Sequence, residues 1–172
     1  MKRLSIVALG ILLASACSSS SSSPSTTTGP TTTRFTADLK PANESPAITG
    51  AEASGSGSVT IDLTQTKDAS GNVATSTVNF TANLTGFPAS TVVNIAHIHT
   101  GVAGQNGGIV VNTTINPGEV VLTNGAGTFT RVGISLTNDL AAQIIGGPSG
   151  FYFNIHTAAN PGGVMRGQLV KQ

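Results

Sequence analysis

The chain has few of the residues on which disulfide-linked, carbohydrate-binding and nucleic-acid-binding proteins depend. Of its 172 residues, one is cysteine, one is tyrosine and none is tryptophan. A single cysteine excludes a disulfide within the chain, and the scarcity of tyrosine and tryptophan argues against carbohydrate binding, which uses stacking aromatic rings. Charged residues make up 9% of the chain, with eight basic and seven acidic side chains. No basic patch is therefore predicted, and nucleic acid is not expected as a partner.

The start of the chain has the pattern of a processing segment. Two basic residues precede an apolar run over residues 4–13, which is shorter than the roughly 20 residues of a membrane span. Small residues at 14–16 then precede Cys17, an arrangement that resembles the lipobox of bacterial lipoproteins. We therefore predict a lipoprotein signal peptide over residues 1–16 and a lipid anchor on Cys17. The alternative is an ordinary secretory signal followed by an unused cysteine.

Residues 17–33 are rich in serine, threonine, proline and glycine after the cysteine. Such a stretch has nothing apolar to bury, so we predict a disordered tether that holds a folded domain away from a membrane. Anchor and tether together predict a protein of the bacterial cell envelope, outside the cytoplasm, on the outer membrane or at the cell surface. Its predicted partners are the membrane, through Cys17, and an extracellular or envelope protein.

Residues 34–172 show the two-residue period of β-strands almost throughout. In residues 58–63 and 77–84, every second side chain is apolar and the others are polar. One segment differs: Thr137 or Asn138 is placed to cap a short helix over residues 137–146. Further strands are predicted at residues 34–39, 91–99, 109–115, 127–134, 150–157 and 163–170. The pattern predicts one all-β domain, an antiparallel immunoglobulin-like or Greek-key β-sandwich or barrel of about eight strands.

The three histidines of the chain lie in two of these predicted strands. His97 and His99, in AHIHTG, are two residues apart and therefore share one face of a strand, which is also predicted to hold Val93 and Ile95. His156, in FYFNIHT, lies on the face opposite the alternating apolar side chains of its strand. Imidazole nitrogens bind copper and zinc. His97, His99 and His156 are therefore a candidate metal site, with copper or zinc as the candidate cofactor.

Four other polar residues are predicted to lie near His156. Tyr152 and Asn154 share its strand face. A turn at NPGG pairs His156 with residue 165 or 166, so Arg166 can lie beside it across a hairpin. Glu44 lies in the loop PANESPA near the end of a strand, where it can meet a histidine or Arg166. The alternative, which we favour from the sequence, is that Glu44 is solvated in a turn. These four residues form a candidate polar cluster.

Three interpretations of the histidines and Arg166 are open. They can stabilise long glycine-rich loops by hydrogen bonding to backbone carbonyls, they can bind a metal ion, or they can take part in catalysis. Catalysis has the least support, because the chain has no G-x-S-x-G motif, no cysteine beyond Cys17, and only scattered acidic residues. We therefore expect a protein that is not an enzyme.

Four segments resemble the CHRD domain, a repeat of the extracellular BMP antagonist chordin that also occurs in microbial secreted proteins. They are ANESPA, SGSGSVTIDL, AHIHTGVAGQNGGIVV and YFNIHTAANPGGVMRGQL, and their order and spacing agree with the family from about Phe35 to Leu169. Ser45 and Ile109 stand where the family usually has valine and proline. The resemblance implies an immunoglobulin-like sandwich or barrel but supplies no binding residues. The leading expectation is a lipid-anchored, non-enzymatic binding or envelope module of unknown partner.

A weaker likeness is to the Cu,Zn superoxide dismutases, which are also Greek-key β proteins. In both, an H-x-H pair on one strand is combined with a third histidine on a late strand. That family also uses a bridging histidine, further zinc ligands and a cysteine pair, which this chain lacks once Cys17 carries lipid. Dismutase activity is therefore not expected. The alternative function is an envelope protein that binds copper or zinc through three histidines, since likeness of fold does not confer activity.

Overall fold

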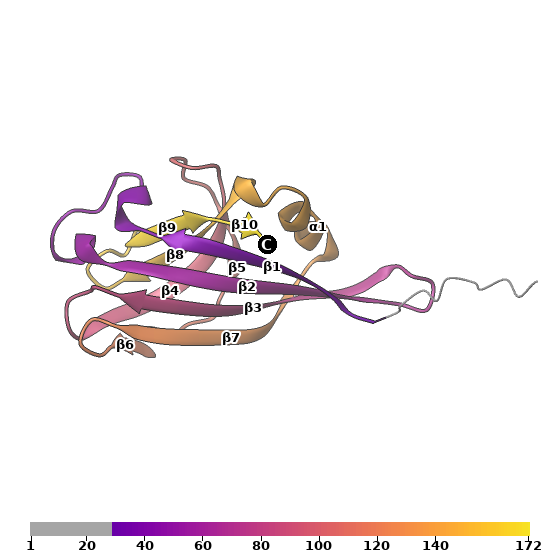
Figure 1. Ribbon diagram of the computed structural model, residues 1–172, viewed down its shortest axis with the longest axis horizontal. Helices are drawn as coiled ribbons and strands as arrows, with labels where there is room; N and C mark the ends of the chain where they lie inside the picture. Colours follow the sequence, from indigo (N-terminus) through magenta and orange to yellow (C-terminus); the bar gives the residue numbers. More distant parts are fainter. Residues whose placement is uncertain (1–28) are drawn as a thin grey trace, which may run out of the picture.

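A computed structural model describes residues 29–172 as two antiparallel β-sheets packed face to face (Figure 1). The first sheet has the strand order β10-β1-β2-β3-β7, and the second has the order β5-β4-β8-β9, with β6 also paired to β4. The strands are β1 (Thr31–Leu39), β2 (Ser56–Lys67), β3 (Val73–Thr85), β4 (Thr91–Thr100), β5 (Ile109–Asn112), β6 (Val120–Leu122), β7 (Gly127–Leu136), β8 (Phe151–Thr157), β9 (Met165–Gln168) and β10 (Val170–Lys171). The predicted signal peptide over residues 1–16, Cys17 and most of the predicted tether lie outside the described residues.

The arrangement confirms the predicted all-β sandwich, and the sheets do not close into a barrel. Two strands differ from the prediction. β6 was not predicted, and the single strand predicted at 163–170 is divided into β9 and β10. The predicted start of the domain at residue 34 also needs a correction. β1 begins at Thr31, which pairs with Gln65 of β2, so the first three residues of the strand lie within the stretch predicted as tether.

The core lies between the two sheets and is built by alternate side chains. On β2 and β3 the apolar positions of the predicted alternation are buried, and the ring of Phe80 on β3 lies 5.6 Å from that of Phe153 on β8. Burying one such side chain stabilises the fold by about 1.5–3 kcal/mol. The buried apolar residues of these two strands are Val59, Ile61, Leu63, Val78, Phe80, Ala82 and Leu84.

The predicted helix is present as α1 (Asn138–Gly146), between β7 and β8. Thr137 is its N-cap, and the hydroxyl of Thr137 accepts a hydrogen bond from the backbone N–H of Leu140 at 3.2 Å. Three short 3₁₀ helices complete the structure: η1 (Pro41–Asn43), η2 (Ala51–Ser54) and η3 (Pro148–Gly150). Within residues 29–172, no helix has the length and hydropathy needed to span a membrane.

The second sheet is buried on both of its faces at β8. All seven β8 residues are buried, although only Phe151, Phe153 and Ile155 belong to the core between the sheets. The opposite face of β8 lies under three loops: the segment after β1, the loop between β4 and β5, and the turn between β8 and β9 (Figure 1). This loop-covered face carries the predicted polar residues.

Candidate metal centre

The three histidines lie together on the loop-covered face of the second sheet. β4 and β8 are adjacent, and in their register His97 pairs with Asn154, His99 with Tyr152, and His156 with Ile95. The register shifts between Val93 and Ile95 of β4, and Val93 is in the core. The prediction that Val93 shares the histidine face was therefore wrong, because simple alternation does not allow for the bulge.

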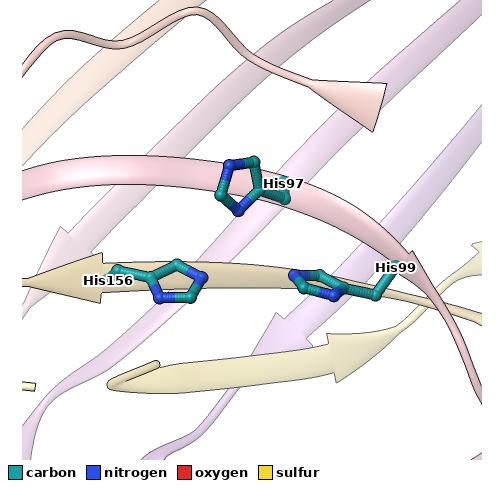
Figure 2. Close-up of side chains that lie close together, drawn as sticks. All are labelled: His97, His99 and His156. Atoms are coloured by element: carbon teal, nitrogen blue, oxygen red, sulfur yellow. The ribbon is translucent and has the colours of Figure 1, made fainter. Parts of the chain in front are cut away.

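The rings of the three histidines converge on one point (Figure 2). The ring centroid of His97 lies 5.6 Å from that of His99 and 5.2 Å from that of His156. The centroids of His99 and His156 are 6.2 Å apart. One nitrogen atom of each ring lies within 4.8 Å of the corresponding atoms of the other two. Three nitrogens that each bind one metal at about 2.0–2.1 Å are about 3.3–3.6 Å apart. Binding one ion therefore requires separations of up to 4.8 Å to shorten towards this range.

Backbone carbonyls fix the tautomers of two of the three histidines. The Nδ1 atom of His99 lies 3.0 Å from the carbonyl oxygen of Gly107, and that of His156 lies 2.9 Å from the carbonyl oxygen of Pro161. A carbonyl only accepts, so each Nδ1 carries the proton and each Nε2 presents a lone pair. Metal-bound histidines commonly have this second contact, which orients the ring and raises the basicity of the ligand atom.

The ring nitrogens that face the convergence point have no protein partner. The Nε2 atoms of His99 and His156 and the Nδ1 atom of His97 are buried without a hydrogen bond. The residues themselves are 8%, 7% and 3% exposed, so bulk water does not fully replace the missing partners. Buried polar atoms are hydrogen-bonded in more than about 90% of cases, and an exception needs a physical explanation.

Burial keeps the three imidazoles neutral. It lowers the pKa of His97 to about 4, and positive charge on His156 or His99 would lower it further. Burial also lowers the pKa of His99 and of His156, although their hydrogen bonds to Gly107 and Pro161 act in the opposite direction. Neutral imidazole is the form that binds a metal ion. The ligands are therefore ready at neutral pH without losing a proton.

Arg166 lies in the same layer, beside Asn154 rather than His156. The β8–β9 register pairs Asn154 with Arg166 and Ile155 with Met165, so the predicted pairing of His156 with Arg166 was wrong. The observed pairs are centred on Asn160, which is earlier in the chain than the predicted pairing requires, so Arg166 pairs with Asn154, two residues before His156. The Arg166 side chain is 3% exposed.

The Arg166 guanidinium connects two of the covering loops. Its Nε donates to the carbonyl of Asn43 at 2.7 Å, and its Nη1 donates to the Gln105 carbonyl at 3.1 Å and the Asn106 side-chain oxygen at 2.8 Å. Asn106 in turn donates to the carbonyl of Ser45 at 3.0 Å. The segment after β1 and the loop between β4 and β5 are thus joined over the site.

Glu44 lies beside Arg166, and this contact was one of the alternatives predicted for it. Its Oε2 lies 3.6 Å from the Nε of Arg166, and its side chain is 6% exposed. At this distance the two groups form an ion pair without a hydrogen bond. Burial raises the pKa of Glu44 to about 7, against the lowering effects of the Arg166 charge and of the Ser45 backbone N–H.

Tyr152 links Arg166 to the histidines. Its ring is stacked on that of His99, with centroids 4.9 Å apart and an angle of 6° between the planes. The Cζ atom of Arg166 lies 4.8 Å from the centre of the same tyrosine ring, within the range of a cation–π contact. The Tyr152 hydroxyl accepts a hydrogen bond from the backbone N–H of Gly107 at 3.3 Å. All four members of the predicted polar cluster therefore lie in one layer with the histidines.

Glu52, which was not among the predicted site residues, is a buried acid under the β8–β9 turn. Glu52 is 7% exposed, and its Oε2 accepts hydrogen bonds from the Thr157 hydroxyl at 2.6 Å and from the side-chain amide of Asn160. These bonds hold the turn whose Pro161 carbonyl orients His156. No local motif marks Glu52, because its partners are more than 100 residues away in the chain.

The unpaired polar atoms of the described chain are concentrated in this layer. Every buried side-chain nitrogen or oxygen without a hydrogen-bond partner in residues 29–172 belongs to it. These atoms are Glu44 Oε1, His97 Nδ1, His99 Nε2, Asn154 Oδ1, His156 Nε2 and Arg166 Nη2. A ligand-binding site accounts for such a concentration, whereas random packing defects would be spread over the molecule.

Comparison with known proteins identifies the family of this domain. Neither the curated proteins nor the solved structures contain a significant match to the chain. The model of the CHRD domain family matches residues 35–169, which include both sheets except for the first four residues of β1 and the whole of β10. The match covers the histidine segments, Glu44 and Arg166, and it agrees with the resemblance carried by the four sequence segments. The chain belongs to the CHRD domain family.

Proposed function

We propose that this protein binds one copper or zinc ion through His97, His99 and His156. The observation that carries the proposal is the convergence of three unpaired, buried imidazole nitrogens within 4.8 Å of one another. Copper and zinc are the ions that imidazole ligands suit best among the metals available to proteins. Three protein ligands leave one coordination position open, as in zinc sites that bind water or substrate.

The arrangement favours metal binding over a purely structural role for the histidines. Histidines that only stabilise loops need one hydrogen bond to a carbonyl each, and His99 and His156 already make that bond through Nδ1. Their other nitrogens gain nothing from being buried face to face, because two lone pairs cannot bond to each other. A metal ion satisfies all three lone pairs at once. The proposal covers binding and does not include a reaction.

The single tyrosine of the chain makes the proposal directly testable. Tyr152 stacks on His99 and there is no tryptophan, so the ultraviolet-excited emission above 300 nm comes from one residue at the site. We expect Cu(II) to quench the emission of the full-length protein and to saturate at one equivalent, because a bound paramagnetic ion is close to the ring. Zn(II) added first should delay the quenching. A protein that retains no copper or zinc after gel filtration contradicts the proposal.

We propose further that the domain is held at the bacterial cell envelope by lipid on Cys17, outside the cytoplasm. The sequence pattern at residues 14–17 supports this, and several acyl chains anchor a protein far more firmly than one. We expect radiolabelled palmitate to be incorporated into the wild-type protein and not into Cys17→Ser, with the wild type in the membrane fraction. Labelling that persists in Cys17→Ser contradicts the anchor, and its outcome is independent of metal binding. An extracellular protein partner remains part of this proposal.

A further inference from the structure

The candidate ligand set brings no negative charge to a bound metal. Its members are three neutral imidazoles, and within residues 29–172 no carboxylate or thiolate joins their group. An imidazole that binds a metal ion does so in its neutral form. The whole charge of the ion therefore stays on the complex. A divalent ion leaves two positive charges on the site, and a monovalent ion leaves one.

Burial makes each unit of that charge unfavourable. His97, His99 and His156 are at most 8% exposed, and the loops after β1 and β4 lie over them. Charge in a poorly hydrated environment loses solvation free energy unless opposite charge compensates it. The loss grows steeply with the charge of the ion, so a neutral, buried site disfavours divalent ions more than monovalent ones.

Arg166 adds a fixed positive charge next to this site. Its Cζ lies 4.8 Å from the Tyr152 ring, and the ring of His99 lies 4.9 Å from the same ring, so the guanidinium and the His99 imidazole are at most about 10 Å apart. Guanidinium groups in proteins stay charged. At 3% side-chain exposure, solvent screens this charge little.

The acidic groups near the site compensate Arg166 only in part. Glu44 faces Arg166 at 3.6 Å without a hydrogen bond, and burial raises its pKa to about 7, so it is partly protonated at neutral pH. Glu52, under the β8–β9 turn, is held by Thr157 and Asn160 on the side of His156. Neither carboxylate is among the candidate ligands.

From this neutral ligand set, its burial and the adjacent guanidinium, we infer that the site prefers monovalent copper, Cu(I), over divalent ions, and that Arg166 is a residue that sets this preference. Copper is the first-row metal of this class with a stable monovalent ion. A three-nitrogen site also suits Cu(I), whereas zinc in proteins usually has four ligands. The inference rests on the proposed function, because it presupposes that the three histidines bind a metal.

The size of the Arg166 effect follows from Coulomb's law. If the metal is taken as about 10 Å from the guanidinium, one extra unit of charge on it changes the relative affinity for divalent and monovalent ions on the order of tenfold at an effective dielectric constant of about 20. For a one-electron couple a tenfold change corresponds to about 59 mV. Removing the charge of Arg166 should therefore lower the Cu(II)/Cu(I) reduction potential by about this amount.

The test compares full-length wild type, Arg166→Gln and Arg166→Lys. Cu(I) affinity is measured anaerobically by competition with bicinchoninate, Zn(II) affinity by competition with a chromophoric chelator, and the reduction potential of the copper-loaded protein by redox titration. We expect the wild type to bind Cu(I) more tightly than Zn(II). In Arg166→Gln the ratio of Cu(I) affinity to Zn(II) affinity should fall about tenfold, and the reduction potential should fall as well. Arg166→Lys keeps the positive charge and should retain the wild-type ratio.

A purely structural role for Arg166 predicts a different result. Loss of its bonds to Asn43, Gln105 and Asn106 would weaken the binding of Cu(I) and of Zn(II) by a similar factor in both variants. The affinity ratio and the reduction potential would then be unchanged. That result, or a wild type that prefers Zn(II), overturns the inference while leaving metal binding intact. If no ion binds to the wild type, the proposed function itself has failed.

Two further variants keep the test decisive. Arg34→Gln is the matched control, because Arg34 pairs with Asp62 on the first sheet and is 59% exposed at its side chain; it should change neither ratio nor potential. Glu44→Gln removes a partial negative charge and should shift the ratio in the opposite direction, towards Cu(I). If Arg166→Gln fails to fold, Glu44→Gln decides: an unchanged ratio, or a shift towards Zn(II), overturns the inference.

Discussion

Replacing His99 or His156 by alanine is expected to lower the Cu(II) affinity of the protein by at least about 100-fold. Loss of a residue that only orients a ligand typically lowers affinity 10- to 100-fold, and each of these substitutions removes a ligand itself. The carbonyl contacts of Gly107 and Pro161 leave the Nε2 atoms of both rings unpaired. Two remaining histidines can hold an ion only weakly. Competition with a chelator of known affinity measures the loss.

Thermal unfolding separates the loss of a ligand from the loss of a structural contact. A bound metal stabilises the native state in proportion to the logarithm of its concentration relative to Kd, so copper should raise the Tm of the wild type and leave His99→Ala and His156→Ala almost unchanged. The metal-free variants should lose some stability as well, because each substitution removes a buried ring and its hydrogen bond to Gly107 or Pro161. The rise in Tm on adding copper is therefore the readout of ligand loss. A large drop in the Tm of the metal-free variants, with copper affinity retained, would show that the histidines are structural.

Thr113→Val is a suitable control for these two substitutions. Thr113 is fully buried near β4, and its hydroxyl donates to the carbonyl of Ala96 at 2.8 Å. The change removes a buried hydrogen bond without removing a candidate ligand, and it should lower the Tm of the metal-free protein while leaving copper affinity within about twofold.

The strands of the sandwich were predictable because side chains on a strand alternate between two faces. The buried positions follow that alternation over residues 59–63 of β2 and 76–84 of β3, and no other local pattern competes with it there. The helix α1 was predictable for a similar reason, since Thr137 supplies a cap at one end and paired glycines follow at the other. Local chemistry determines these elements.

For the candidate site, the sequence predicted which side chains share a face, but not how the site is enclosed. Strand phase places Tyr152, Asn154 and His156 on one face, and the structure puts all three in one layer with His97 and Arg166. The alternation of side chains along a strand does not show which segments cover that face. Three loops from distant parts of the chain supply it, and their positions depend on contacts such as those of Arg166 and Glu52. Register errors at Val93 and Arg166 have the same cause, because bulges and turn lengths are set by tertiary packing.

Gly107→Ala is the second substitution with a large expected effect, and it tests the carbonyl that orients His99. A Cβ atom at Gly107 would lie 1.7 Å from the carbonyl oxygen of Thr100 and 2.8 Å from its hydroxyl. These contacts are far too short, so the backbone at residue 107 must move. The movement displaces the Gly107 carbonyl from the Nδ1 of His99 and its N–H from the Tyr152 hydroxyl. We expect copper affinity to fall about 10- to 100-fold, the range for loss of an orienting contact.

Gly108→Ala provides the matched control one residue away in the same loop. A Cβ atom at Gly108 meets nothing within 4 Å, and the hydrogen bond from the N–H of Thr100 to the Gly108 carbonyl does not require glycine. Copper affinity and Tm should therefore stay close to those of the wild type. Equal losses in the two variants would point to a general effect on the loop between β4 and β5. Full affinity in Gly107→Ala would show that His99 finds its orientation without this carbonyl, and the stacked Tyr152 ring would then be the contact that remains to hold it.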